Sequence, residues 1–423
     1  MAAARYGQRG VFDFLVSKGC DEEMIDDSGN NILHVACLGG DLKLVKSILV
    51  KETVGINSRG HCGRTPMMAA ARMGHKHVLK TLLNSQCDAS LVDDDNNNIL
   101  HYACIGGHLD VVQYILKRTI IDINSKGKHG MTPVMISVEI DHRHMFNLLV
   151  HKGAELSHVD DNENNILHLT CSSGNVKMVT DLLAKDSVDI NSRGQNGGTA
   201  LMWATWWHQS DVIDLLLSKG ADASLTDNDG NNILHNACIG GHLEVVQYIL
   251  KKNIVDINCK GKHGMTPVMI SLDVRHMLVF DFLVRREADL SHVDDNGNNI
   301  LHLACLWGCK VIAKYILSKH IVDIDSKGQS SRTPVMMAAV SGHKEVFSLL
   351  VSEGANLSSI DASGNNILHL GCLGGSESIV QHILSHNVVD INAMNHDGSK
   401  ATNIATEQGH SSICELLGPQ PTN

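Results

Sequence analysis

The amino-acid sequence predicts an all-α solenoid, a stack of short helix pairs, and three observations lead to this fold class. A segment Asn-Ile-Leu-His with a Cys three residues later returns at one constant interval, with its histidine at His34, His101, His168, His235, His302 and His369. A fixed period of this kind is typical of repeat architectures. The 423 residues exceed what one growing hydrophobic core accommodates. A hydrophobic content of 43% with only 4% aromatic residues suits thin helical layers.

The repeating unit divides into two related halves of nearly equal length, here called first-type and second-type repeats. First-type repeats start at Asp26, Asp93, Asp160, Asp227, Asp294 and Asp361, and second-type repeats at Gly60, Gly127, Gly194, Gly261 and Gly328. We predict eleven full repeats over 26–394, a partial repeat over 1–25, a capping repeat over 395–417 and a tail over 418–423. Because residues 1–25 contain only the back half of a repeat, we expect a segment of a longer array.

Residues that cap helices mark the helix starts in both types of repeat. Second-type repeats contain Gly-x-x-Gly-x-Thr-Pro, as at Gly63-Arg64-Thr65-Pro66, where Thr is a good N-cap and Pro suits the first helical position. In first-type repeats an Asn such as Asn31 takes the N-cap position. A second helix follows, and the stretch 108–116 places a wide apolar stripe on it. Glycines such as Gly153 then predict a left-handed helix end.

This order of features resembles the ankyrin repeat, whose unit has about 33 residues. The likeness consists of the cap, an Ala-rich first helix, Gly-His, a Val-rich second helix and Gly-Ala. It covers essentially the whole chain, as about twelve to thirteen repeats. The resemblance implies a β-turn plus two antiparallel helices per repeat, with a concave groove that binds another protein.

Two departures from the family pattern are visible. The segments Ser137–Asp141 and Ser271–Arg275 lack the Ala pair and the following Gly, so we expect these two layers to pack less regularly. Second-type repeats also carry Met where the family has His, at Met68, Met135, Met202, Met269 and Met336.

The composition argues against several classes of function. The net charge is −11 and Lys and Arg form no run, which disfavours nucleic acid and anionic membranes as partners. The apolar runs are too short to span a bilayer, and no basic-then-apolar signal begins the chain. Six of the 12 cysteines recur once per repeating unit, too far apart for disulfides. We expect a reduced, monomeric protein of the cytoplasm or nucleus, without membrane insertion.

The sequence offers no constellation for catalysis or a bound metal. His302, Cys305 and Cys309 share one helical neighbourhood, but two of them are periodic repeat positions and no second Cys pair follows at zinc-site spacing. Gly-x-Ser-x-Gly, a phosphate loop and His-Glu-x-x-His do not occur. We therefore predict a non-enzymatic protein without cofactor or metal.

Charge alternates along the predicted turn tips, acidic in first-type repeats and basic in second-type repeats. From these tips we assign to the partner-binding surface Arg64, Lys128, Lys262, Asp161, Asp229 and Asp295. Two interpretations stay open. In the first, adjacent tips form ion pairs with each other as a solvated ladder, and each exposed pair stabilises the fold by about 0–1 kcal/mol. In the second, the alternating charges bind a charged ligand.

An apolar line is the second candidate feature of the groove. All four tryptophans of the chain lie in two predicted first helices. We assign to the partner-binding surface Trp203, Trp206, Trp207, Ile239, Val274, Leu306 and Trp307, which centres it on residues 200–310. Buried packing between repeats is one explanation of the tryptophans. Exposure at the centre of a binding hot spot is the other.

Asparagines in the inter-repeat loops are the third candidate. The pattern places Leu eight residues before an Asn that follows an apolar residue, at Asn57, Asn124, Asn191, Asn258 and Asn392. This resembles the ankyrin loop context modified by an intracellular asparaginyl hydroxylase. The alternative is a turn-favouring Asn that bonds its own backbone.

The function predicted from these features is protein–protein recognition by an interaction module or scaffold. Two alternatives stay open. The chain is a scaffolding or spring-like segment of a larger cytoskeletal, channel or signalling protein, or an adaptor that presents substrates to a ubiquitin ligase or phosphatase. An ankyrin resemblance implies a mode of recognition and leaves the partner open.

Overall fold

The computed structural model describes residues 1–185 and 187–418 of the chain, and it is helical throughout this part. The chain divides into two compact units, Met1–Asp222 and Ala223–Asn423. Within the described residues extended backbone is limited to isolated bridges such as Val159 with Asn165. The all-α prediction is therefore confirmed.

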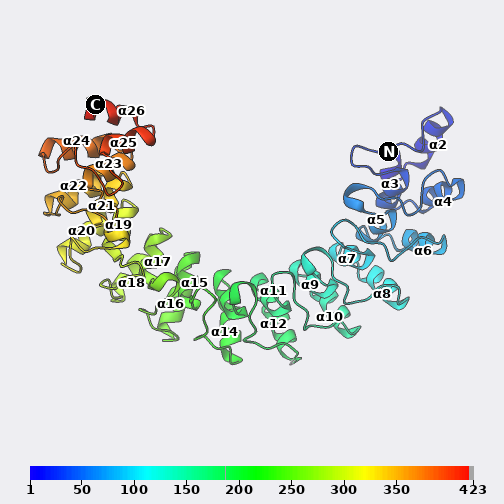
Figure 1. Ribbon diagram of the computed structural model, residues 1–423. Helices are drawn as coiled ribbons and strands as arrows, with labels where there is room; N and C mark the ends of the chain where they lie inside the picture. Colours follow the sequence, from blue (N-terminus) through cyan, green and yellow to red (C-terminus); the bar gives the residue numbers. More distant parts are fainter. Residues whose placement is uncertain (186, 419–423) are drawn as a thin grey trace. The chain divides into compact units, whose positions relative to one another are not determined.

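The first unit consists of seven helix pairs, and a short 3₁₀ turn (η) precedes the first helix of each second-type repeat (Figure 1). Its elements are α1 (Ala2–Arg5), α2 (Arg9–Ser17), α3 (Ile32–Gly39), α4 (Leu42–Lys51), η1 (His61–Gly63), α5 (Pro66–Arg72), α6 (Lys76–Asn84), α7 (Ile99–Ile105), α8 (Leu109–Lys117), η2 (Lys128–Gly130), α9 (Pro133–Glu139), α10 (Arg143–His151), α11 (Ile166–Ser173), α12 (Val176–Leu183), η3 (Gln195–Gly197), α13 (Ala200–Trp206) and α14 (Ser210–Ser218).

The second unit repeats the same arrangement in six helix pairs. Its elements are α15 (Ile233–Gly240), α16 (Leu243–Lys251), η4 (Lys262–Gly264), α17 (Pro267–Asp273), α18 (Met277–Arg285), α19 (Ile300–Leu306), α20 (Lys310–Ser318), η5 (Gln329–Ser331), α21 (Pro334–Val340), α22 (Lys344–Ser352), α23 (Ile367–Leu373), α24 (Glu377–His386), α25 (Ala401–Glu407) and α26 (Ser411–Leu417).

Each helix packs on its own partner, and within each unit the inner helices also pack on the equivalent helix of the next repeat. In the first unit α5 lies between α3 and α7, and in the second α19 lies between α17 and α21. We call the odd-numbered helices inner and the even-numbered helices outer. Residues such as Leu79 on α6 and Ala103 on α7 are fully buried between these layers. Because the helices are short, stability comes from stacking on neighbours rather than from each helix alone.

The Asn caps of first-type repeats form as the sequence predicts. In α7 the Asn98 Oδ1 accepts the backbone N–H groups of Leu100 at 2.9 Å and His101 at 3.2 Å. The Asn98 amide also donates to Ser125 Oγ at 2.7 Å, in the loop before the next repeat. One side chain therefore caps its helix and ties two layers together.

The Thr caps of second-type repeats form only in part. Thr65 and Thr199 accept the N–H of the Met three residues later, each at 3.4 Å. Thr132, Thr266 and Thr333 have the extended backbone of an N-cap, but their buried hydroxyls have no hydrogen-bond partner among the described residues. The expectation of a side-chain cap is wrong for these three repeats, although Met stands three residues later here as it does after Thr65 and Thr199.

The two layers expected to be irregular have the same backbone as their neighbours. Helices α9 and α17 have seven residues each, as does α5. Where α5 is followed by Gly74 (φ 76°), these repeats hold Asp141 (φ 53°) and Arg275 (φ 65°) in the left-handed region. The Asn175 amide of the next layer donates to Asp141 Oδ1 at 2.6 Å. The backbone of these two layers is therefore regular, and the expectation that they pack less regularly stays a prediction.

Each first-type repeat buries one histidine between two layers. In His101 the Nδ1 atom accepts the N–H of Asn98 at 3.2 Å, and Nε2 faces the carbonyl oxygens of Ser125 at 3.1 Å and Met131 at 3.3 Å. Carbonyl oxygens only accept hydrogen bonds, so Nε2 carries the proton of a neutral ring. Burial lowers the pKa of His101 to about 4. Burial also lowers the pKa of the equivalent residues His34, His168, His235, His302 and His369.

Candidate protein-binding site

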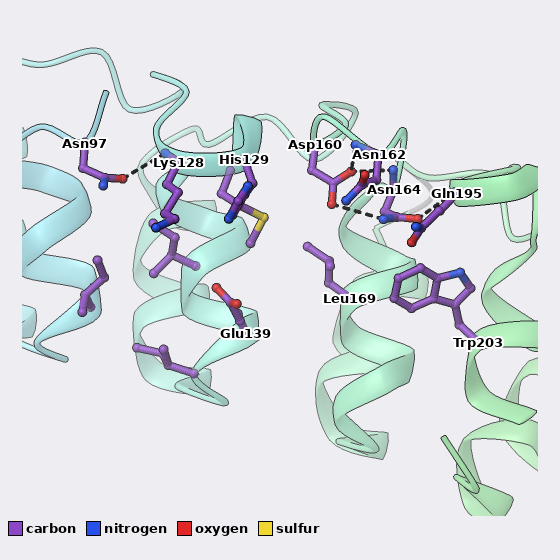
Figure 2. Close-up of a pocket in the computed structure, with 14 residues that line it drawn as sticks. Asn97, Lys128, His129, Glu139, Asp160, Asn162, Asn164, Leu169, Gln195 and Trp203 are labelled. Atoms are coloured by element: carbon purple, nitrogen blue, oxygen red, sulfur yellow. Dashed lines mark hydrogen bonds between the residues drawn. The ribbon is translucent and has the colours of Figure 1, made fainter. Parts of the chain in front are cut away.

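A hollow of about 710 Å³ opens on the first unit between the turn tips and the inner helices (Figure 2). Turns η2 and η3 form its upper edge, and helices α7, α9, α11 and α13 form its floor. It is lined by Asn97, Ile105, Lys128, His129, Met131, Ile136, Glu139, Ile140, Asp160, Asn162, Asn164, Leu169, Gln195 and Trp203.

The floor of the hollow is mainly apolar. Ile105 at the end of α7 and Ile140 just after α9 are large apolar residues that stay exposed. Figure 2 shows the Trp203 indole beside Leu169, beneath Gln195. The Trp203 ring meets the buried His168 edge to face, with centroids 6.0 Å apart and planes at 74°. Trp203 is therefore anchored by packing while part of its surface faces the hollow.

The rim of the hollow is polar and held by hydrogen bonds between repeats. Asn97 Oδ1 accepts the Lys128 N–H at 3.0 Å, and Asn164 Oδ1 accepts the Gln195 N–H at 2.9 Å (Figure 2). Asn164 also donates from its amide to Asp160 Oδ2 at 3.2 Å. Since the tips are fixed to each other, the hollow is preformed in the free protein, which lowers the ordering cost of binding.

Two further predicted residues, Trp206 and Trp207, lie at the carboxyl end of α13 in the first unit. Their exposed fractions are 45% and 54%. Exposed tryptophan is the side chain most enriched in binding hot spots. The alternative in which these two residues are core packing does not fit their exposure.

The other predicted apolar residues belong to the second unit and are more enclosed. Trp307 donates from Nε1 to Asp273 Oδ1 at 3.0 Å, and the Arg275 guanidinium lies 4.7 Å from its ring centroid. It therefore joins two layers. Val274 is exposed, whereas Ile239 and Leu306 are half-buried.

Several of the predicted tip charges pair with neighbouring tips. Lys128 contacts Asp95 at 3.2 Å and Lys262 contacts Asp229 at 3.2 Å, each toward the preceding first-type tip. This matches the ladder interpretation for Lys128, Lys262 and Asp229. Asp161 and Asp295 instead join their tips through backbone N–H groups, which donate to the preceding second-type tip.

Arg64 is held differently from the other tip cations. Its Nε donates to the Tyr102 hydroxyl at 2.6 Å, and the Tyr102 hydroxyl in turn donates to the buried carboxylate of Asp93. The guanidinium also lies 5.4 Å from the Tyr102 ring centroid. Arg64 thus has a structural role between two layers.

The loop asparagines join consecutive repeats. Asn258 Oδ1 accepts the N–H of Asp289 at 2.8 Å, and the Asp256 carboxylate accepts the N–H of Asn258 itself at 3.0 Å. The same bond to the next repeat forms at Asn57, Asn124 and Asn191, whereas Asn392 accepts from Lys400 Nζ at 3.2 Å. In the four loops that read Asp-Ile-Asn, the Asp and not the Asn therefore makes the turn bond. Hydroxylation of these asparagines stays a prediction.

Replacing Asn258 with Ala will destabilise the second unit by about 1–2 kcal/mol, because the N–H of Asp289 loses its acceptor. Asn258→Asp will cost less than half as much, since Asp325 accepts the N–H of Asn356 at 2.8 Å in the equivalent position. Urea unfolding of the three proteins measures both effects. Equal midpoints for wild type and the alanine variant would contradict this role.

The periodic cysteines are buried thiols. All 12 cysteines lie within the described residues and are free. Burial raises the pKa of Cys104 and its periodic equivalents well above the ordinary value, so they are not thiolates at neutral pH. In the part of the chain that the structure describes, no three His, Cys, Asp or Glu side chains are grouped as a metal site requires. Among the same residues no helix is both long and apolar enough to cross a bilayer.

The sequence prediction missed most of the hollow's floor, although the signal was present. Ile105 occupies the same position of a first-type repeat as Ile239 and Leu306 do further along the chain. Ile140 corresponds likewise to Trp207 and Val274 in second-type repeats. Applying the groove positions to every repeat would have placed both isoleucines on the same groove surface as Trp203.

Stacked helix pairs with linked turn tips define the chain as a helical-repeat protein. A family model for ankyrin repeats (three copies) matches residues 1–93, 78–160, 142–227, 211–293 and 276–361. The chain belongs to the ankyrin-repeat family. Ankyrin repeats generally mediate protein–protein interaction and are themselves non-enzymatic.

Three relatives illustrate the range of proteins that this chain resembles. The ankyrin repeat protein L371 of Acanthamoeba polyphaga mimivirus is 23% identical over 319 residues, which cover 60% of this chain and 42% of the relative. The human transient receptor potential cation channel subfamily A member 1 is 25% identical over 334 residues, which cover 68% of this chain and 30% of the relative. The ankyrin repeat domain-containing protein SAT10 of Stachybotrys chartarum is 23% identical over 369 residues, covering 85% and 18%. The chain therefore spans less than half the length of each relative.

Proposed function

We propose that this chain is a non-enzymatic scaffold or adaptor of the cytoplasm that binds a partner protein through the groove side of its repeats. The observation that carries the proposal is the preformed hollow of the first unit, with an apolar floor and Trp203 anchored in it. Trp206 and Trp207 extend the same unit's apolar surface. An apolar pocket with a few oriented polar groups is what a recognition site requires.

The predicted centre at residues 200–310 falls on both units, so we assign a separate contact surface to each. In the first unit the partner contacts Trp203, Trp206 and Trp207. In the second unit Val274 is the most accessible of the predicted apolar residues, because Trp307 is engaged by Asp273 and Arg275. The tips that pair with each other set the spacing of the groove and contribute little binding energy themselves.

A second proposal is that the chain is the repeat segment of a larger scaffolding, channel or signalling protein. It is favoured by the greater length of the relatives, one of which is a cation channel subunit. In that case the partner of the groove is a segment of the same assembly. The two proposals share the groove and differ in whether the partner is recruited from outside.

Substituting Trp206 and Trp207 with Ala will weaken partner binding about 10- to 100-fold, as expected for hot-spot tryptophans. Affinity purification from the native host with quantitative mass spectrometry measures the loss. The matched control is Val50→Ala, which removes an 85% exposed apolar side chain from α4 of the same unit. Circular dichroism confirms that each variant is folded. An unchanged partner profile in the double tryptophan variant would refute this assignment.

A further inference from the structure

One position of the outer helices is apolar in two consecutive repeats and polar, charged or Gly in the others. The second residue of the outer helix is Leu278 in α18 and Val311 in α20. In the remaining outer helices this position holds Gly, a charged residue or a polar residue, namely Gly10, Lys43, His77, Asp110, His144, Lys177, Asp211, Glu244, Glu345, Ser378 and Ser412. The two apolar residues therefore depart from the pattern together.

Both residues point away from the core. Leu278 is 72% exposed and Val311 is 83% exposed, and Tyr315, one turn further along α20, is 39% exposed. Figure 1 shows α18 and α20 in succession among the outer helices of the second unit. Their inner partners α17 and α19 pack on each other, and packed helices lie about 8–10 Å apart. Leu278, Val311 and Tyr315 thus stand exposed on two consecutive outer helices, and we call these three residues the apolar strip.

The charge around this strip is positive although the chain is acidic. Helices α18 and α20 contain three cations, Arg285, Lys310 and Lys314, against one carboxylate, Asp281. None of the three cations forms a salt bridge with a described residue.

In the first unit, two outer helices have cations that form salt bridges with the next outer helix. Lys76 of α6 pairs with Asp110 of α8 at 3.8 Å, and Arg143 of α10 pairs with Asp181 of α12 at 2.8 Å. The α18–α20 face therefore combines exposed apolar residues with cations that form no salt bridge to a described residue.

We propose that the α18–α20 face is a second docking surface, separate from the groove, for an acidic amphipathic helix of a partner protein. A partner helix lying across α18 and α20 meets Leu278, Val311 and Tyr315 with its apolar residues. Its Asp and Glu residues flank that apolar row and meet Arg285, Lys310 and Lys314. Charge complementarity selects an acidic helix over a basic one and speeds its association.

The test uses a fluorescein-labelled peptide of about 18 residues, five helical turns long. Its leucines follow helical spacing and glutamates fill its polar face. We expect fluorescence anisotropy to show micromolar binding to the full chain that weakens with added salt. The variant Leu278→Glu/Val311→Glu will bind at least about 10-fold more weakly. Both substitutions introduce Glu, the residue that α16 and α22 already carry at this helical position (Glu244 and Glu345), so we expect the fold to be retained.

The matched control is Ser378→Glu/Ser412→Glu, which adds the same charges at the same helical position on α24 and α26. This control and wild type will bind alike, and a peptide with lysines in place of the glutamates will not bind. Failure of the acidic peptide to bind, or equal binding by the Leu278→Glu/Val311→Glu variant, would overturn the proposal. So would a wild-type dimer in light scattering that this variant abolishes, which would assign the face to a second copy. Binding of phosphatidylserine vesicles in place of the peptide would assign it to a membrane.

Discussion

Lowering the pH from about 7 to about 5 will strongly destabilise this chain, because six buried histidines are held neutral in the fold. In the unfolded chain each imidazole has the ordinary pKa of 6.5, whereas burial lowers the pKa of His101 and of His235 to about 4 in the folded state. Between these values the unfolded chain binds protons that the folded chain does not. Stability is therefore complete above about pH 6.5 and decreases as the pH falls toward 4.

The expected size of the effect is large because the histidines act together. Each contributes up to about 1.4 kcal/mol per pH unit inside its window. Urea midpoints at several pH values, followed by circular dichroism, measure the slope. The Asn98 Oδ1 lies 2.8 Å from Nδ1 of His101 and would accept a proton there, which opposes the effect without outweighing burial. Equal midpoints at pH 7 and 5 would contradict the prediction.

The variant Met135→His tests whether burial at this repeat position sets the slope. Met135 occupies the repeat position of His101 in the adjacent layer and is 1% exposed. A histidine there adds one buried imidazole. The pH dependence of stability should become steeper by about 1.4 kcal/mol per pH unit. If stability depends on pH equally in this variant and in wild type, burial at this position does not lower the pKa of a histidine there.

The repeat architecture could be predicted from the sequence because its signals are local. The Asn-Ile-Leu-His segment specifies a cap within one turn of helix, as in Asn98 with Leu100 and His101. The left-handed helix end predicted at Gly153 forms, with φ 91°. Each of these features depends on residues fewer than five positions apart. Local chemistry repeated at a fixed period is sufficient to define the stack.

Contacts between layers could not be predicted in the same way. Trp307 and Trp207 look equivalent in the sequence, yet Trp307 is engaged by Asp273 and Arg275 of the preceding repeat while Trp207 is 54% exposed. The partners of Trp307 lie a whole repeat away in the chain. Likewise Asp141 and Asn175 replace the family's Gly and His in adjacent repeats and bond to each other. That two such substitutions in adjacent repeats contact each other can be recognised only when the structure shows which residues of the two layers meet.

Replacing His101 with Met will lower the free energy of unfolding by about 2–4 kcal/mol, because one buried and one half-buried backbone group lose their partners. Met fits the space, since second-type repeats bury Met at this position. The buried N–H of Asn98 loses the acceptor Nδ1, and the carbonyl of Ser125 loses the donor Nε2. Each unmatched buried group costs about 1–3 kcal/mol. Urea unfolding of wild type and variant at neutral pH measures the difference.

The opposite substitution, Met to His in a second-type repeat, should stabilise the chain. The reason is that the Thr132 hydroxyl is buried without a partner among the described residues. Met135→His places an imidazole nitrogen where it can accept that hydroxyl, with an expected gain of about 1 kcal/mol at neutral pH. Met202→His is the matched comparison and should gain less, since the Thr199 hydroxyl already accepts the N–H of residue 202 at 3.4 Å. If His101→Met were neutral, the buried histidines would be packing residues only. The alternation of His and Met layers would then have no bearing on how firmly successive repeats are joined.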